Sequence, residues 1–231
     1  AGLRAVVVGN GPSVLPARGA KGADLGPVID SYDHVYRFNL FKTKGYERHV
    51  GTKTTHWVLS MIKNAQDMDE EEVPAITEHL KVIMIPMLFR DCKGVAALAK
   101  GCTGHVSSPA LKKRQHERIV KAEKDNKQWS ALPKRAKVQA LALKENDVLY
   151  GKYELYEKYP STGLQVLNMA AEQYDEVAFV GFDFESADHQ HYWETKIKNE
   201  TCHNMNQEAV LIRQFIAEGR LTRLGAARVG A

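Results

Sequence analysis

The sequence predicts an α/β protein with a largely parallel β-sheet, and three observations carry this prediction. Short apolar runs, among them Leu3–Val8 and Val177–Val180, have the length and composition of buried strands. Segments with helical periodicity alternate with these runs, which is typical of parallel strands joined by crossover helices. The 231 residues can bury one sizeable core, and no repeat or linker divides them, so we expect a single domain over residues 1–231.

The individual elements follow from local patterns. Alternating or continuous apolar residues predict further strands, Pro160 and Asn204 mark expected helix starts, and two basic polar segments are typical of exposed helices. The further expected strands are His34–Phe38, Thr54–Leu59 and Val82–Ile85. One expected helix begins near Gly163, and the others span Leu111–Lys127, Pro133–Lys144 and Asn204–Glu218. The acidic run Asp67–Glu72 is expected to be the solvated start of another helix.

Composition and charge limit the classes of partner that the protein is expected to bind. Hydrophobic residues make up 44% of the chain and charged residues 26%, and the net charge is +4, which permits an anionic ligand. Most of the positive excess lies within Lys112–Lys137, so nucleic acid is not an expected partner. No apolar run approaches the ~20 residues that cross a bilayer. The chain opens on a predicted strand without an initiating Met, and we expect a trimmed domain whose N-terminal anchor has been removed.

No metal site is expected. The three cysteines Cys92, Cys102 and Cys202 form no CxxC pair of the kind that binds a metal. The sequence does not decide whether Cys92 and Cys102 form a disulfide. The candidate acidic pairs, Asp67-Met68-Asp69 and Asp183-Phe184-Glu185, are interpreted as structural.

The first predicted strand ends in a glycine-rich turn, Gly9-Asn10-Gly11-Pro12-Ser13. Such a turn commonly opens a nucleotide-binding α/β unit, because glycine lets the backbone approach a ligand closely. A nicotinamide-dependent dehydrogenase would use this turn with Asp30 or Asp33 on the ribose. The third glycine of that fingerprint is missing, which makes this interpretation weak.

Two other stretches can carry chemistry. Ser161 or Thr162 can cap a helix whose N-terminus would attract a phosphate or carboxylate, although an ordinary capped core helix has the same pattern. Near the C-terminus, His203 precedes a predicted helix, and Glu208 lies far enough into that helix to orient it as a general base. Alternatively, His203 is a histidine packed in the core with no catalytic role. A third interpretation is that the histidines of this region bind a metal, but the spacing of His189, His191 and His203 fits no metal-binding motif.

Four blocks of the sequence, in order, resemble the motifs of the eukaryotic-type sialyltransferase family and together cover roughly half of the chain. The family's third motif is similar to His191-Tyr192-Trp193-Glu194, and its fourth, a His with a Glu five residues later, to His203 and Glu208. The long motif resembles Ala5–Gly11, Gly26–Asp33, Val35–Asn39 and Val50–His56, and the short motif resembles Pro160–Gly163, Asp175–Val177 and Gly181–Phe182.

The resemblance implies one Rossmann-like domain, a variant of the GT-A fold, that transfers sialic acid from CMP-sialic acid to a glycan hydroxyl with inversion. It implies His203 as general base and His191 as a hydrogen-bond donor to the leaving phosphate. It also implies a type II protein of the Golgi lumen, with its anchor outside this chain. The donor-binding residues that it implies are Asn10, Gly11, Asn39, Ser161, Thr162, Gly163, Tyr192 and Trp193.

A phosphate monoanion leaving group needs less neutralisation than a diphosphate, so no metal or other cofactor is expected. Animal members join the long and short motifs by a disulfide, whereas this chain has Ala5 and Tyr174 at those positions, and Gly11 stands where the family commonly has Ser. These departures fit a divergent, algal- or plant-like branch of the family. Because the resemblance to plant and algal members implies CMP-Kdo or a related keto-sugar acid as donor, a CMP-Kdo transferase is a close alternative. A noncatalytic sugar-nucleotide or glycan-binding domain is a more distant one, because binding alone needs no base. The sequon at Asn199 is predicted to stay unglycosylated, since a glycan there would crowd the acceptor.

Overall fold

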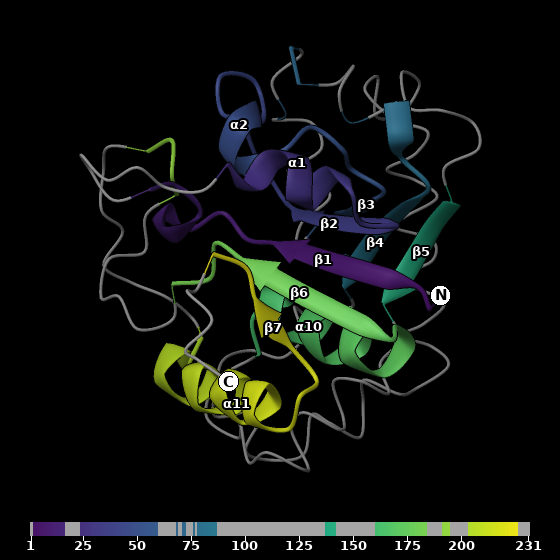
Figure 1. Ribbon diagram of the computed structural model, residues 1–231. Helices are drawn as coiled ribbons and strands as arrows, with labels where there is room; N and C mark the ends of the chain where they lie inside the picture. Colours follow the sequence, from purple (N-terminus) through teal and green to yellow (C-terminus); the bar gives the residue numbers. More distant parts are fainter. Residues whose placement is uncertain are drawn as a thin grey trace, which may run out of the picture.

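The computed structural model describes residues 2–16, 24–59, 68, 71–72, 76, 78–86, 137–141, 160–183, 191–194 and 203–225. Its strands form one sheet in the order β5-β4-β3-β2-β1-β6-β7, and every neighbouring pair is parallel (Figure 1). The predicted α/β class with a parallel sheet is confirmed. The strands are β1 Arg4–Val8, β2 His34–Phe38, β3 His56–Val58, β4 Val82–Pro86, β5 Lys137–Leu141, β6 Glu176–Val180 and β7 Thr222–Arg223.

Helices cover both faces of the sheet (Figure 1). On one side lie α1 (Leu25–Asp30) and α2 (Glu47–Val50), and on the other lie α10 (Thr162–Gln173) and α11 (Met205–Ala217). The helices expected from Gly163 and from Asn204 to Glu218 are therefore present within a residue or two. In the part of the chain that the structure describes, no helix is long and apolar enough to cross a membrane.

One predicted helix is wrong in part. Residues 137–141, inside the expected helix Pro133–Lys144, form strand β5 and pair with β4 from Val82↔Lys137 to Pro86↔Leu141. In that stretch Val138 and Ala140 alternate with Lys137 and Gln139, which is the strand period of two, and pairing with β4 outweighs the helical composition around it. The expected helix Leu111–Lys127 lies outside the described residues.

Within the acidic run Asp67–Glu72, Glu71 is exposed as expected, whereas Glu72 is buried rather than solvated. The other acidic residues of the run lie outside the described residues. Its carboxylate accepts hydrogen bonds from the Thr43 N–H, the Thr43 hydroxyl and the Lys44 N–H, at 3.0, 2.7 and 3.2 Å. Satisfying a buried carboxylate in this way offsets the cost of its burial. Glu72 therefore fixes the loop that follows β2.

The core has two layers because alternate residues of each strand point to opposite faces. Ala5 and Val7 of β1 pack toward α10 with Leu164 and Leu167, whereas Val6 and Val8 pack toward α1 with Ile29. The chain leaves β1 for β2 by way of α1 on one face, and it enters β6 from α10 on the other. The boundary between β1 and β6 is therefore the topological switch point, where open α/β sheets bind ligands at the carboxyl ends of their strands.

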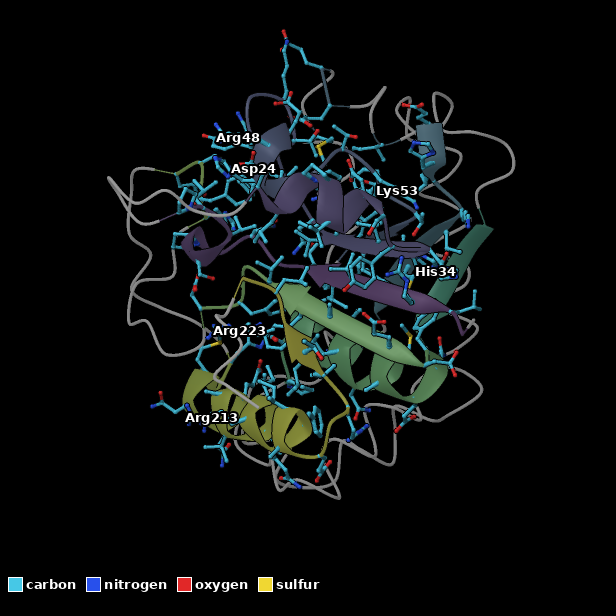
Figure 2. The ribbon with its side chains drawn as sticks, in the orientation of Figure 1. Asp24, His34, Arg48, Lys53, Arg213 and Arg223 are labelled. Atoms are coloured by element: carbon cyan, nitrogen blue, oxygen red, sulfur yellow. The ribbon has the colours of Figure 1, made fainter. Side chains whose placement is uncertain are left out.

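A cluster of aromatic rings fills the opposite, amino-end edge of the sheet, where Figure 2 shows His34. The Tyr36 and Tyr174 hydroxyls lie 2.7 Å apart in a hydrogen bond, and the His56 ring stacks on Tyr36 with centroids 4.2 Å apart. The His34 ring lies 4.8 Å from that of Tyr174. Tyr174, which follows the end of α10, thus joins this helix to β2 by packing and a hydrogen bond.

Burial lowers the pKa of His56 to about 3 and also lowers the pKa of His34. Both histidines are consequently neutral in the folded protein around pH 7.

We expect acid to destabilise the protein through His56. Its pKa lies below the ordinary value of 6.5, so the unfolded chain binds the proton more readily, and stability present above pH 6.5 is lost as the pH falls toward 3. The loss attributable to His56 has a limiting slope of about 1.4 kcal/mol per pH unit. Urea unfolding at several pH values should show a flatter acid limb for His56→Phe than for wild type.

Replacing the exposed His79 by Gln is the matched control and should leave the acid limb as steep as in wild type. If stability fell as steeply with acid in His56→Phe as in wild type, protonation of His56 would not be what destabilises the folded protein.

Candidate active site

The carboxyl ends of β1 and β6 are bound directly to each other at the switch point. The Gly9 N–H donates to the Val180 carbonyl and the Gly11 N–H to the Gly181 carbonyl, both at 2.8 Å. A Cβ on either Gly9 or Gly181 would overlap the backbone of the other, and Gly181 has a φ of +73°. These glycines therefore serve the close approach of two protein segments. The N–H groups that a dehydrogenase would turn toward a pyrophosphate are occupied, which argues against that alternative.

Asn10 ties three segments together from the centre of this edge. Its side-chain Nδ2 donates to the carbonyls of Phe38 and Leu40 at 3.0 and 2.9 Å, and its own carbonyl accepts from the Tyr192 N–H at 2.9 Å. Between the two bonded carbonyls lies Asn39, which has a φ of +48°. Asn10 thus holds Asn39 in the left-handed region, an arrangement that asparagine tolerates better than most residues.

The segment 191–194 packs against this centre. The Tyr192 hydroxyl donates to the Lys42 carbonyl, its ring meets Tyr46 edge-on, and burial raises the pKa of its phenol. The His191 ring stacks on Trp193 with centroids 4.7 Å apart, and its Nδ1 lies 3.1 Å from the Glu194 carboxylate. The His191 side chain is partly exposed at this edge.

The start of α10 approaches the same edge through Phe182. A Cβ on Gly163 would lie 2.5 Å from the Phe182 ring, and a Cβ on Gly9 would lie 3.0 Å from it. The ring also meets Phe38 edge-on, with centroids 5.9 Å apart. Phe182 therefore connects the ends of β1, β2 and β6 to the helix start that carries Ser161 and Thr162.

Ser161 caps α10 and is itself held by α11. Its hydroxyl accepts from the Leu164 N–H at 3.1 Å, as the sequence predicts for an N-cap. The same hydroxyl donates to Glu208 Oε2 at 2.5 Å, and the Ser161 N–H donates to Glu208 Oε1 at 2.6 Å. These are charge-assisted hydrogen bonds when Glu208 is ionised.

Glu208 is fully buried, and burial raises its pKa to about 7, opposed by the two hydrogen bonds from Ser161. The sequence predicts that Glu208 orients His203; the structure places both Glu208 oxygens on Ser161. His203 lies just before Asn204, the N-cap of α11, so Glu208 links the His203 segment to the start of α10. Sequence patterns could not identify this partner, because Ser161 and Glu208 are 47 residues apart.

The structure therefore places the expected residues in two groups at one edge. Asn10, Gly11 and Asn39 lie with the 191–194 segment, while Ser161–Gly163 lie with Glu208 and the start of α11. Phe182 and Asp183 also lie at the ends of β1 and β6. From the sequence, Phe182 is named only as part of the short motif and Asp183 is interpreted as structural, so neither is an expected site residue. Within the described residues no three His, Cys, Asp or Glu side chains form a possible metal site. Several residues considered above fall outside the described residues: Asp67, Asp69, Glu185, His189, Asn199 and the three cysteines.

A family model for glycosyltransferase family 29 (sialyltransferase) matches residues 3–220. The chain belongs to this family. The predicted resemblance to the sialyltransferase family is thereby confirmed.

Curated relatives agree with family 29. The chain is 29% identical over 202 residues to CMP-N-acetylneuraminate-beta-galactosamide-alpha-2,3-sialyltransferase 1 of Pan troglodytes and 30% identical over 204 residues to that of Gallus gallus. These matches cover 83% of this chain but 48% and 47% of the relatives. The chain thus spans about half the length of the curated relatives it matches.

Solved structures show the same fold. A mammalian sialyltransferase in complex with Gal-beta-1-3GalNAc-ortho-nitrophenol superposes with a TM-score of 0.57 at 22% identity. The alignment covers 97% of this chain and 70% of that one. The predicted sialyltransferase-like fold is confirmed.

We expect Glu208→Ala to lower the free energy of unfolding by about 3 kcal/mol, because it leaves the partly buried N–H and hydroxyl of Ser161 without their acceptor and empties a buried site. Glu208→Gln should cost less. In wild type the raised pKa of Glu208 means that the folded state holds the proton more tightly, so its contribution to stability falls as the pH rises from 4.5 to about 7. Chemical unfolding at pH 5 and pH 8 should show wild type losing stability relative to Glu208→Gln across this interval.

Glu172→Gln, at an exposed carboxylate near the end of α10, should follow wild type at both pH values. Parallel curves for wild type and Glu208→Gln would contradict the raised pKa.

Proposed function

We propose that this domain transfers sialic acid from CMP-sialic acid to a hydroxyl of a glycan acceptor. The observation that carries the proposal is that a part of each of the four family motifs lies at, or is hydrogen-bonded into, one edge of the sheet in a chain that belongs to family 29. The relatives' names state a beta-galactosamide acceptor, which makes β-galactosides the first acceptors to test. By the same family relationship we propose the Golgi lumen as its site of action, with a type II anchor outside this chain.

The proposed reaction is a single displacement with inversion. His203 removes the proton from the acceptor hydroxyl as its oxygen bonds to the anomeric carbon. The bond from that carbon to the CMP phosphate oxygen breaks, and its electron pair leaves with CMP. Imidazole suits this work because its ordinary pKa of about 6.5 lies near neutral pH.

Charge accumulates on the phosphate as CMP leaves, and fixed donors near the edge can stabilise it. The N-terminus of α10 directs N–H groups and a partial positive charge toward the sheet edge. His191 is the proposed imidazole donor to the same phosphate. We propose that the reaction requires no metal, because such donors are sufficient to stabilise the charge of a single phosphate monoanion.

A CMP-Kdo transferase is the nearest alternative, since CMP-Kdo carries the same nucleotide and carboxylate. A noncatalytic binding domain would retain CMP affinity without turnover. Both alternatives predict outcomes of one experiment.

We expect the domain to release CMP from CMP-sialic acid in the presence of a β-galactoside acceptor, with and without EDTA. His203→Ala should lower kcat/KM at least ~100-fold, the usual scale for loss of a general base. Release measured with CMP-sialic acid and CMP-Kdo in parallel names the donor.

His79→Ala, which alters an exposed histidine outside the four motifs, is the control and should retain activity. Turnover by His203→Ala at the wild-type rate would reject His203 as the base. CMP binding without turnover of either donor would favour the binding domain.

A further inference from the structure

The segment that follows β6 continues its bonding to β1 through a side chain. After Gly9 and Gly11 donate to the carbonyls of Val180 and Gly181, the next donor in the series is the Ser13 N–H. Its acceptor is the Asp183 carboxylate, with Oδ2 at 3.0 Å. Residues 9, 11 and 13 thus donate in turn, and the third acceptor is a charged side-chain oxygen.

Asp183 and the side chain of residue 11 compete for one volume. A Cβ on Gly11 would overlap Asp183 Oδ2 and would lie 2.8 Å from the Gly181 carbonyl oxygen. The absence of a side chain at Gly11 is therefore what allows the carboxylate to reach Ser13. The two residues act as a pair, although they are far apart in the sequence.

The pair lies where a ligand is expected. It occupies the switch point between β1 and β6, at the carboxyl ends of the strands. Asp183 directly follows Phe182, whose ring contacts the start of α10, and Gly11 directly follows Asn10. Asp183 is partly exposed, and no hydrogen bond within the described part of the chain uses its Oδ1. Arg223, visible at this end of the sheet in Figure 2, binds the Phe182 carbonyl at 3.1 Å.

A carboxylate accepts hydrogen bonds from hydroxyl groups and repels phosphate. The Gly11–Ser13 turn is therefore unsuited to the charged part of a nucleotide, even though turns of this kind often hold phosphates. The N-terminus of α10, on the other side of Phe182, has the opposite polarity. In CMP the ribose is bonded directly to the phosphate, so a phosphate at α10 would bring the ribose hydroxyls toward Asp183.

We propose that Asp183 is a specificity-determining residue of the donor site, which binds the ribose hydroxyls of CMP and excludes phosphate from the Gly11–Ser13 turn. This inference rests on the proposed function. It also explains a departure from the family, since the carboxylate of Asp183 occupies the space that a serine side chain at position 11 would need.

The test measures binding of CMP and of 2′,3′-dideoxy-CMP by calorimetry. Wild type should bind CMP about tenfold more tightly than the dideoxy compound, the scale of a hydrogen bond to a charged group. Asp183→Ala should bind the two compounds equally. Asp183→Asn, which keeps an acceptor for the Ser13 N–H, should retain part of the preference.

Asp33→Ala is the matched control, because Asp33 likewise accepts a backbone N–H of the β1 segment, from Arg4 at 2.9 Å, but at the amino-end edge. It should leave the ratio of the two affinities unchanged. The pairing with residue 11 is tested separately: Gly11→Ser should lower the melting temperature in wild type and lower it less in the Asp183→Ala background, where only the close approach to the Gly181 carbonyl oxygen remains.

The outcomes separate the two levels of inference. A wild-type domain that binds no CMP overturns the proposed function and this inference with it. CMP binding with the same affinity ratio in wild type and Asp183→Ala overturns the role of Asp183 alone. Equal weakening of both ligands in Asp183→Ala would also overturn it, because Asp183 would then only shape the turn.

Discussion

The contact between the ends of β1 and β6 is the constraint on which this site depends. Two backbones approach so closely at Gly9 and Gly181 that neither position has room for a Cβ. From this contact the chain positions Asn10 on one side and Phe182 on the other. The hydrogen bonds of Asn10 then fix the loop after β2, and the ring of Phe182 meets the start of α10. A side chain at Gly9 or Gly181 would therefore disturb all of these elements together.

A second constraint is the buried carboxylate of Glu208. Burying an ionisable group is expensive, and here both donors of one serine offset part of the cost. Because Ser161 is also the cap of α10, the position of that helix start depends on a residue of α11. The proposed base and the proposed anion site therefore share one rigid connection, although they come from separate parts of the chain.

The sequence predicts much of this fold because apolar runs and caps are local signals. β1, β2, β3, β4 and β6 follow from their apolar composition, and α10 from Ser161. β5 does not, because its basic surroundings favour a helix and only its pairing with β4 makes it a strand. β7 has two residues and carries no periodic signal.

The candidate site shows the same division between local and tertiary information. The motif residues could be named from their resemblance to a family. The partner of Glu208 and the space shared by Gly11 and Asp183 could not, because both depend on distances between segments that only the folded chain brings together.

The order of strands in the sheet has a consequence for how the protein acquires its site during synthesis. β1 is made first, yet one of its two neighbours, β6, begins at residue 176, and the bond from Ser13 to Asp183 spans 170 residues. Contacts this distant in sequence form slowly, because a long loop must close, at a cost in chain entropy, before the contacts can stabilise the fold. A nascent or C-terminally truncated chain that ends before β6 has half of the switch point and no Glu208 to hold Ser161. The proposed nucleotide binding would thus report completion of the domain, and a bound nucleotide would stabilise only the chains that had reached it.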